Sequence, residues 1–176
     1  MTITAIKNAV TEVLPAVTPE AYREGMSSLA AAVNVVTTTG PEGRAGFTAT
    51  AVCSVSDTPA TLLVCLNRGA SVHQVFKNST HLVINTLTSQ HQLISNTFGG
   101  KAPMNERFEI GDWVESTTGC PRLADAAVSF DCIITDVKSV ATHDVIFCQV
   151  VDIKQDQEAD ALLYYQRGYH SACKDA

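Results

Sequence analysis

Hydroxyl-bearing residues recur through the segment GFTATAVCSVSDTP, which runs from Gly46 to Pro59. Side chains of an extended strand alternate between its two faces, so residues two positions apart share a face. An extended backbone would therefore present a row of hydroxyls on one face, made of Thr48, Thr50, Ser54, Ser56 and Thr58. Such a row could hydrogen-bond a flat polar ligand. An ordinary alternating strand without a ligand would show the same pattern.

A cationic turn follows the next apolar run. The run ATLLVCL (60–66) is typical of a buried strand, and it ends in the turn Asn67-Arg68-Gly69-Ala70-Ser71. A guanidinium with two polar neighbours suits an anion such as phosphate. Ser71 also lies near the start of an expected helix, where unpaired amides favour phosphate. The alternative is a plain turn followed by a helix cap.

The familiar catalytic motifs are missing from the sequence. The segment GPEGRAG does not match G-x-G-x-x-G, and Gly99-Gly100-Lys101-Ala102 lacks the first glycine and the Ser/Thr of a P-loop. The chain also has no G-x-S-x-G elbow and no cluster with metal-ligand spacing. Hydroxyls, backbone amides and a few cations remain. Such a site favours an organic cofactor that carries the reactivity itself.

Size and composition indicate one domain with a large buried surface. The chain has 176 residues, of which 45% are hydrophobic and 17% charged, and its net charge is −6. So low a charge density suggests that part of the surface is buried between subunits, and we expect a homodimer. The sequence has no run of Lys and Arg, so we expect neither nucleic acid nor membrane as a partner.

The cellular location follows from what the termini and cysteines lack. The start MTITAIKNAV has no basic region or continuous apolar core, and no stretch approaches the roughly 20 apolar residues of a membrane span. The six cysteines form no C-x-x-C pair, and several lie in apolar runs, where thiols act as small hydrophobes. We therefore expect a cytoplasmic protein without disulfides or zinc.

Helical spacing is confined to a few segments. Residues 2–14 have near-helical apolar spacing ended by Pro15, and Thr18-Pro19 starts a second helix that should run to about Ala31. Its buried stripe would be Tyr22, Met26 and Leu29. Shorter helices are expected at 70–77, after Ser89 with Gln92 as its capping-box partner, and at NERF (105–108).

Period-two patterns dominate the rest of the chain. Segments rich in β-branched residues predict strands at 33–39, 46–52, 60–66, 81–87, 126–137, 142–153 and 162–166, with a hairpin turn at 40–43. Many short strands with few helices favour an all-β barrel or sandwich. The strands 126–137 and 142–153 are apolar on both faces, which is a second indication of a dimer.

The ordered motifs resemble those of one family. RAGFTATAVCSVSDTP, LLVCLNRGAS, SNTFGGKAPMNERF, VSFDC, THD and YYQRGYH occur in the same order as in short-chain flavin reductases, the reductase components of two-component flavin monooxygenases. The resemblance covers about residues 22–170. Within the family the motifs most resemble the pyrimidine-utilisation flavin reductases, followed by the 4-hydroxyphenylacetate 3-monooxygenase reductases.

The resemblance implies a fold, an activity and partners. The expected fold is all-β with peripheral helices: a six-stranded Greek-key split β-barrel over 18–172, preceded by a helical extension over 1–17. It implies a homodimer that binds FMN or FAD at the subunit edge and takes hydride from NADH, with NADPH left open. Reduced flavin would then diffuse to a flavin-dependent monooxygenase. A flavin-binding protein without turnover, and a β-barrel scaffold without cofactor, are the alternatives.

The resemblance also assigns residues to the cofactor. Small Ala49 and Ala51 would let the backbone approach the isoalloxazine, while Thr48 and Thr50 would bond its polar edge. The ribityl chain and the phosphate would lie along the next part of the segment, at Cys53, Ser54, Val55 and Ser56. The cationic turn, with Asn67, Arg68 and Ser71, would complete the anion pocket.

Contacts from more distant segments are expected as well. Lys101 could meet phosphate, although exposed lysines often have no specific contact. His143 would contact the nicotinamide, in a turn where relatives have Gly-Asp-His or Gly-Thr-His and this chain has Ala141 in place of glycine. A capped turn histidine is the alternative. Arg167, Tyr169 and His170 match a terminal R-x-Y-H pattern that in relatives reaches flavin or dinucleotide, unless the terminus frays.

Overall fold

One antiparallel sheet forms the body of the protein. The computed structural model describes residues 15–173. The strand order in the seven-stranded sheet is β3-β2-β6-β9-β10-β5-β4. These strands are β2 (Asn34–Gly40), β3 (Gly43–Ala49), β4 (Val52–Asp57), β5 (Ala60–Asn67), β6 (His81–Thr86), β9 (Val128–Val140) and β10 (His143–Gln155). The mainly β architecture confirms the strand predictions, and Gly40 pairs with Gly43 across the predicted hairpin turn.

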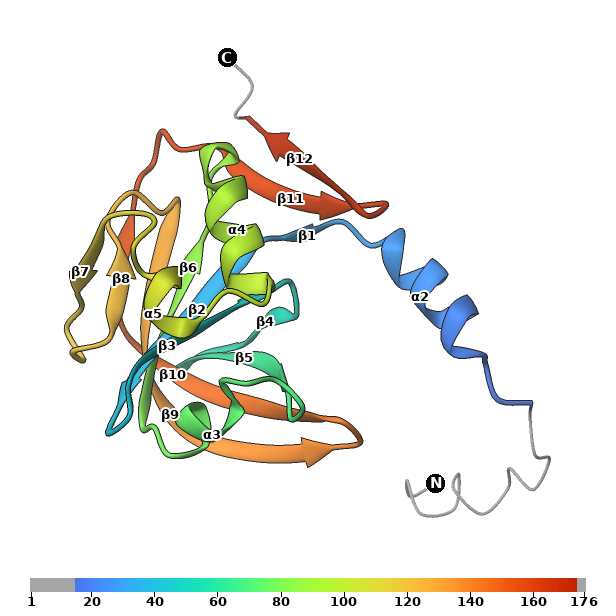
Figure 1. The fold of residues 1–176 in the computed structure, drawn as a ribbon, viewed down its shortest axis with the longest axis horizontal. Helices are drawn as coiled ribbons and strands as arrows, with labels where there is room; N and C mark the ends of the chain where they lie inside the picture. Colours follow the sequence, from blue (N-terminus) through green and yellow to red (C-terminus); the bar gives the residue numbers. More distant parts are fainter. Residues whose placement is uncertain (1–14, 174–176) are drawn as a thin grey trace.

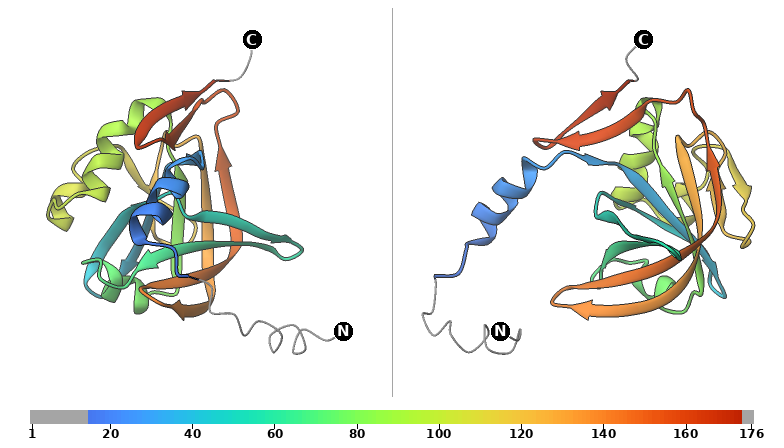
Figure 2. Two further views of the ribbon diagram at one scale, coloured as in Figure 1. Left: turned by 90° about the vertical axis from the view of Figure 1, so that its right-hand side faces the viewer. Right: turned by 180° about the vertical axis from the view of Figure 1, so that it is seen from behind.

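The sheet curves until its two edges approach each other. The edge strands β3 and β4 are consecutive in the chain and are joined only by Thr50 and Ala51. The amide of Cys65 on β5 donates to the Ala51 carbonyl at 3.1 Å, which ties this link to the far side of the sheet. The ribbon views show the strands bending around the concave side (Figures 1 and 2). The link therefore lies where both edges of the sheet meet.

The concave side of the sheet is filled by one apolar cluster. It contains buried side chains from strands β2, β3, β5, β6, β9 and β10 and from the helix that follows β5, and its members include Val36, Phe47, Leu66, Phe76, Leu82, Cys132 and Ile146. Because strands from both halves of the sheet contribute, burial of this cluster holds the curved shape. The rings of Phe47 and Phe76 meet edge to face with centroids 5.0 Å apart.

The predicted strand 46–52 is wrong in its C-terminal half. β3 ends at Ala49, the chain turns at Thr50 and Ala51, and β4 starts at Val52 and pairs with β5 instead of β2. The hydroxyls therefore do not form one row: Thr48 lies on β3, Thr50 lies in the turn, and Ser54 and Ser56 lie on β4. Alternation alone does not reveal a turn that contains no glycine or proline.

Within residues 15–173, five helical segments lie outside the sheet. They are α2 (Pro19–Ser27), α3 (His73–Lys77), the 3-10 turn η1 (Ser89–His91), α4 (Gln92–Gly99) and α5 (Met104–Arg107). The Thr18 hydroxyl caps α2 by accepting from the Ala21 amide at 3.2 Å, as predicted. The capping box before α4 uses Thr88 and His91, one residue earlier than the predicted Ser89 and Gln92. The predicted helix at 2–14 lies outside the described residues.

Helix α2 differs from its prediction in burial. It ends at Ser27 instead of about Ala31, and the expected buried stripe is exposed: Tyr22 by 62%, Met26 by 44% and Leu29 by 60%. The helix projects from the body of the chain (Figure 1). The apolar spacing was correct, but no element within residues 15–173 covers that face.

Smaller strands complete the fold. The sequence did not predict β1 (Ala31–Ala32), β7 (Trp113–Glu115), β8 (Pro121–Leu123) or β12 (Gly168–Ala172), whereas β11 (Ala161–Tyr165) matches the predicted last strand. Strands β1, β11 and β12 form one sheet, and β7 pairs with β8. A second apolar cluster packs α4 and these elements on the outer face of the sheet. It includes Val35, Leu87, Ile94, Phe98, Phe108, Leu123 and Leu162.

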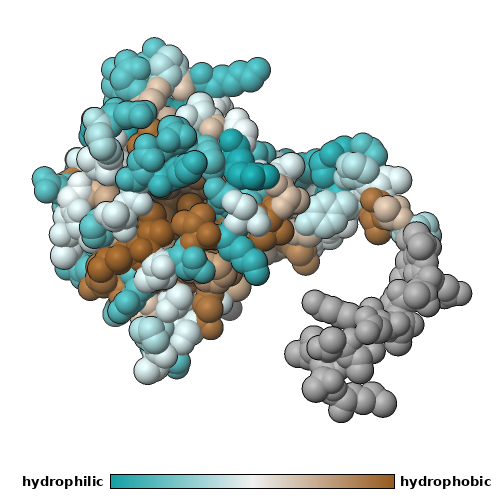
Figure 3. All heavy atoms as spheres, turned by 90° about the horizontal axis from the view of Figure 1, so that it is seen from below, coloured by the Kyte–Doolittle hydropathy of each residue, from teal (hydrophilic) through white to brown (hydrophobic). Residues whose placement is uncertain are grey.

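Apolar residues also remain on the surface. Five of them lie on the two long strands, namely Ile133, Val137, Val140, Val151 and Ile153. Figure 3 shows hydrophobic residues gathered in the middle of the face seen from below.

No helix within residues 15–173 is long and apolar enough to span a membrane. The same part of the chain contains no group of three or more potential metal ligands.

Candidate active site

A cleft opens beside the turn between β3 and β4. Its volume is about 370 Å³, and its walls come from the end of β3, the turn after β5, the end of α4 and the start of β10. It brings together seven of the residues predicted to bind cofactor or nicotinamide: Thr48, Ala49, Thr50, Ala51, Asn67, Ser71 and His143. We call this space the ring cleft. Ala51 is exposed at the cleft, whereas Ala49 is only 8% exposed and belongs to the apolar cluster of the concave side.

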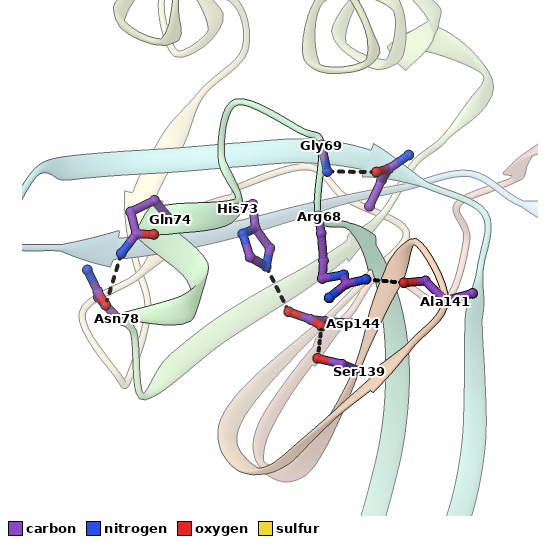
Figure 4. Close-up of polar contacts among 9 residues, drawn as sticks. Arg68, Gly69, His73, Gln74, Asn78, Ser139, Ala141 and Asp144 are labelled. Carbon is purple, nitrogen blue, oxygen red and sulfur yellow. Dashed lines mark hydrogen bonds and ion pairs between the residues drawn. The ribbon is translucent and has the colours of Figure 1, made fainter.

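The turn after β5 and the start of β10 meet at one end of the ring cleft. Strand pairing places His143 directly opposite Asn67. The Asn67 side chain accepts from the Gly69 amide at 2.8 Å, which fixes the turn (Figure 4). Ala141 has a φ of 49°, in the left-handed region that suits the glycine of the relatives. The turn thus forms with alanine, and it presents His143 to the cleft.

Thr48 lines the cleft and also has a structural contact, and its predicted bond to a ligand stays a prediction. Its hydroxyl donates to the Ser95 carbonyl in α4 at 2.7 Å. The hydrogen is therefore already used to attach α4 to β3, and only the oxygen lone pairs remain for a ligand. The two threonines thus differ: Thr48 is part of the scaffold and Thr50 is exposed at the cleft.

A second cleft adjoins the first. Its volume is about 540 Å³, and it shares Ser71, Val72, Gly100 and Arg107 with the ring cleft. Lys101, predicted to meet phosphate, lines this second space and not the first. We call it the basic cleft, because Arg44 and Arg107 line it as well.

Several predicted residues lie away from both clefts in this single chain. Cys53, Ser54 and Val55 are exposed on edge strand β4, and the Ser56 hydroxyl accepts from the Thr58 amide at 3.1 Å. The Arg68 guanidinium donates to the Ala141 carbonyl and lines neither cleft. A direct phosphate contact of Arg68 therefore remains a prediction, and its contact here is with the turn that carries His143.

The C-terminal pattern is ordered but lies outside the clefts. The Tyr169 hydroxyl lies 2.9 Å from the Ser95 hydroxyl and donates to the Asn96 side chain at 2.9 Å. Arg167 donates to Glu24 of α2 at 2.6 Å, and His170 is exposed against the ring of Tyr165. Tyr169 thus attaches β12 to α4, and any ligand contact of Arg167 and His170 remains a prediction.

Arg107 is the functional candidate that the sequence did not single out. It is only 6% exposed, and its guanidinium donates to the carbonyls of Gly46 and Phe98 at 3.1 and 2.9 Å. Two further bonds reach Gly100 at 3.1 Å and Ala102 at 3.0 Å. Burial lowers its pKa from the usual arginine value. Arg107 therefore fixes the Gly100–Ala102 loop and forms the wall between the clefts.

A buried ionisable cluster supports the other wall. His73 Nε2 lies 2.7 Å from an Asp144 oxygen, and the Ser139 hydroxyl donates to the second oxygen at 2.6 Å (Figure 4). The Ser139 bond, then the His73 bond, lower the pKa of the Asp144 carboxyl. Asp144 follows His143, and His73 opens α3 just after Ser71. The cluster therefore holds two cleft-lining segments together.

Two cysteines of the apolar core are unsuited to a catalytic role. Cys132 and Cys148 are fully buried, and burial raises the pKa of both thiols, that of Cys148 to about 12. A thiol with so high a pKa is a poor nucleophile at neutral pH. Cys120 is buried as well, and none of the six cysteines forms a disulfide. Those in the core act as small hydrophobes.

The fold and the clefts agree with comparisons to known proteins. The chain belongs to the flavin reductase like domain family, which matches residues 26–172. An FMN reductase (NADH) RutF of Pantoea ananatis is 52% identical over 155 residues, which cover 88% of this chain and 82% of that protein. A protein of the same name from Escherichia coli O157:H7 is 52% identical over 157 residues, covering 89% of this chain and 96% of the relative.

Solved structures support the same fold. A putative flavin reductase from Haemophilus somnus 129PT superposes with a TM-score of 0.87 at 46% identity, covering 89% of this chain and all of that one. A Streptomyces globisporus NADH:FAD oxidoreductase, solved with NAD and FAD fragments, reaches a TM-score of 0.83 at 22% identity and shows the shared fold alone. Membership of the family and the mostly β fold inferred from the motifs are confirmed.

Proposed function

We propose that the protein is an NADH-dependent flavin reductase that reduces FMN, or FAD, and releases the reduced flavin to a separate monooxygenase. The observation that carries the proposal is the ring cleft, in which Thr48–Ala51, Asn67, Ser71 and His143 converge. Two relatives at 52% identity, both named FMN reductase (NADH), support the donor and the acceptor.

The residues present fit a flavin. The exposed Thr50 hydroxyl offers a hydrogen bond to the polar edge of a planar ring, while Phe47, Leu66 and Phe98 supply apolar walls. A side chain at Gly99 would approach Thr48 to 3.5 Å and narrow the opening of the cleft. Asn67 and Ser71 provide polar contacts at the opposite wall, where the ribityl chain and phosphate would lie.

The reaction places geometric demands on the protein. When bound, the flavin supplies the redox chemistry: it accepts a hydride, two electrons with one proton, and NADH becomes NAD⁺. The chain must hold the two reacting rings about 3 to 3.5 Å apart. That transfer requires no acid or base from the protein. Among residues 15–173, His143 is the one histidine that lines the ring cleft. His143 would orient the nicotinamide.

The test is the consumption of NADH in the presence and absence of FMN, followed by NADH absorbance. We expect rapid consumption that depends on FMN. A matched pair of variants localises the activity: Ala51→Trp, which fills the exposed wall of the ring cleft, and Gln157→Trp, which alters an exposed position after β10 that lines neither cleft. Loss in the first and retention in the second is expected. Absence of any FMN-dependent consumption by the wild-type protein would contradict the proposal.

The same proposal includes a six-stranded Greek-key split barrel that assembles as a homodimer, with flavin at the subunit edge. Support comes from the curved sheet and from apolar residues that one chain leaves exposed, among them Tyr22, Leu29, Val137 and Ile153. A partner covering β4 and α2 would also bring Cys53–Ser56 and Arg167 into an interface. Sedimentation equilibrium should give twice the chain mass of 18.8 kDa, and a mass of one chain would refute the dimer.

The expected partner is the monooxygenase of pyrimidine catabolism, with an aromatic hydroxylase as the alternative, and the expected location is the cytoplasm. The partner follows from the family resemblance, and the location from the N-terminal segment and the scattered cysteines. Because the partner would receive free reduced flavin, no docking surface between the two proteins is needed. A coupled assay, in which either oxygenase is supplied with this protein, FMN and NADH, decides between the two. Turnover by neither oxygenase would refute the assignment of partner.

A further inference from the structure

The hairpin turn that carries His143 has a backbone conformation that its own residues do not favour. Ala141 and Thr142 alone join β9 to β10, since Val140 pairs with His143. In a two-residue hairpin turn, a positive φ at the first central residue is typical of glycine. Ala141 occupies that position with a φ of 49°. The Cβ of alanine makes this conformation unfavourable, so contacts from the surrounding structure must offset the cost.

Arg68 provides such contacts at both residues of the turn. Its guanidinium donates to the Ala141 carbonyl, as Figure 4 shows, and its backbone amide donates to the Thr142 carbonyl at 2.9 Å. Within residues 15–173, this guanidinium is the one side chain from outside the hairpin that bonds to either turn residue. A hydrogen bond from a cation is stronger than one from a neutral donor. Arg68 therefore holds the turn from the end of β5.

The position of the His143 ring depends on this turn. The Thr142 hydroxyl lies 2.9 Å from Nδ1 of His143, which leaves Nε2 as the ring nitrogen for a ligand. The side chain is exposed where it lines the ring cleft, so its backbone and the contact with Thr142 fix it more than packing does. A change of φ at Ala141 would move Thr142 and His143 together.

The chain after His143 is fixed by other groups. Asp144 is 8% exposed, and its carboxylate bonds His73 of α3 at 2.7 Å and Ser139 of β9 at 2.6 Å. Pairing of β10 with β5 continues from His143 to Gln149. None of these contacts reaches the Ala141 carbonyl. The two turn residues are therefore the part of the hairpin that depends on Arg68.

We propose that Arg68 is a positioning residue for the reduction of flavin: it holds the unfavourable turn at Ala141 and thereby fixes His143 at the nicotinamide side of the ring cleft. This inference rests on the proposed function. It gives Arg68 a role that requires no contact with a phosphate. It also makes the arginine dispensable when residue 141 is glycine, because glycine adopts a positive φ without a steric cost from Cβ.

The first experiment measures KM for NADH at saturating FMN in Arg68→Ala, Ala141→Gly and the double variant. A turn that leaves its binding-competent form weakens apparent affinity in proportion to the fraction lost. We expect Arg68→Ala to raise KM about fivefold, the effect of one charge-assisted bond at an exposed site, with a smaller change in kcat. In the Ala141→Gly background the rise should be below about twofold. Equal rises in both backgrounds would overturn the proposal.

A matched control separates this effect from a general loss of positive charge. Lys138 is an exposed cation on β9 of the same hairpin and lines neither cleft. Lys138→Ala should leave KM for NADH unchanged, and a rise as large as that of Arg68→Ala would overturn the proposal.

Titrations with FMN and with riboflavin test direct contact between Arg68 and phosphate. We expect Arg68→Ala to change the two affinities by the same small factor. If it weakened FMN binding and not riboflavin binding, and Ala141→Gly did not restore FMN binding, Arg68 would be a phosphate ligand and the proposal would fail.

The second experiment needs no turnover. Hydrogen exchange of the backbone amides of residues 138–145 is followed by mass spectrometry in protein without flavin or NADH. We expect exchange about fivefold faster in Arg68→Ala than in wild type, and exchange in the double variant no faster than in Ala141→Gly alone. Unchanged exchange in Arg68→Ala would overturn the proposal. Failure of the proposed function is a separate result, because it would appear as wild-type protein that does not oxidise NADH with FMN while exchange at the turn still responds to Arg68→Ala.

Discussion

Replacement of Arg107 by methionine removes the guanidinium but keeps a long side chain, and so tests how the wall between the clefts is held. Two of the carbonyls that Arg107 bonds, those of Gly46 and Phe98, are in buried contacts. A buried acceptor left without its donor costs about 1 to 3 kcal/mol. Two such acceptors give an expected loss of about 2 to 6 kcal/mol in the free energy of unfolding. The other two carbonyls can turn to water.

Urea denaturation followed by tryptophan fluorescence measures this loss, since Trp113 packs against Phe108 with centroids 5.2 Å apart. The matched control is Arg23→Met. Arg23 pairs with Glu20 on exposed α2, and such surface pairs contribute about 0 to 1 kcal/mol. Flavin affinity of Arg107→Met should fall as well, because the loop at Gly100 is no longer fixed. An unfolding free energy equal to that of the wild type would refute the reasoning.

Three further substitutions test other contacts. The pKa of Asp144 is lower in the folded protein than in the unfolded chain. The ionised carboxylate therefore stabilises the fold above the unfolded-state pKa, and this stabilisation is lost as the pH falls through the folded-state pKa. Asp144→Asn should therefore destabilise at pH 7, and its difference from wild type should shrink below about pH 4; a pH-independent difference in urea titrations would contradict this. His143→Ala should raise KM for NADH several-fold, with a smaller change in the Kd of FMN; the reverse pattern in steady-state kinetics and flavin titration would remove His143 from the nicotinamide side. Gly46→Ala would place a Cβ 2.7 Å from the Phe98 ring, so we expect a loss of about 1 to 3 kcal/mol by thermal denaturation, and an unchanged midpoint would argue against that contact.

Most of the sheet could be predicted because its strands follow a local pattern. β-branched runs bounded by turn residues marked β2, β5, β6, β9 and β10, and Thr18-Pro19 marked the start of α2. Short strands such as β7 and β8 escaped prediction because three residues carry no period. The turn at Thr50–Ala51 escaped because it is imposed by closure of the sheet, a long-range effect that the hydroxyl alternation does not record.

The candidate site was predictable where its residues share one motif and not where they meet through space. Thr48–Ala51 and Ser71 belong to ordered motifs, and both line the ring cleft. Arg107 belongs to a motif noted only for its helical turn, and its role depends on carbonyls from three other segments. Arg107 lies between Glu106 and Phe108 in NERF, and that local pattern does not mark it as a buried side chain. Arg68 was assigned by charge, and its actual contact with Ala141 arises from the pairing of β5 with β10.

The central claim is that the ring cleft holds flavin in position to receive hydride from NADH. The most direct measurement is the anaerobic absorbance of the oxidised flavin after protein-bound FMN is mixed with NADH. We predict that the flavin absorbance bleaches much faster than with free FMN and NADH, and that Ala51→Trp abolishes the acceleration. Bleaching at the rate of free FMN in the presence of the wild-type protein would contradict the account.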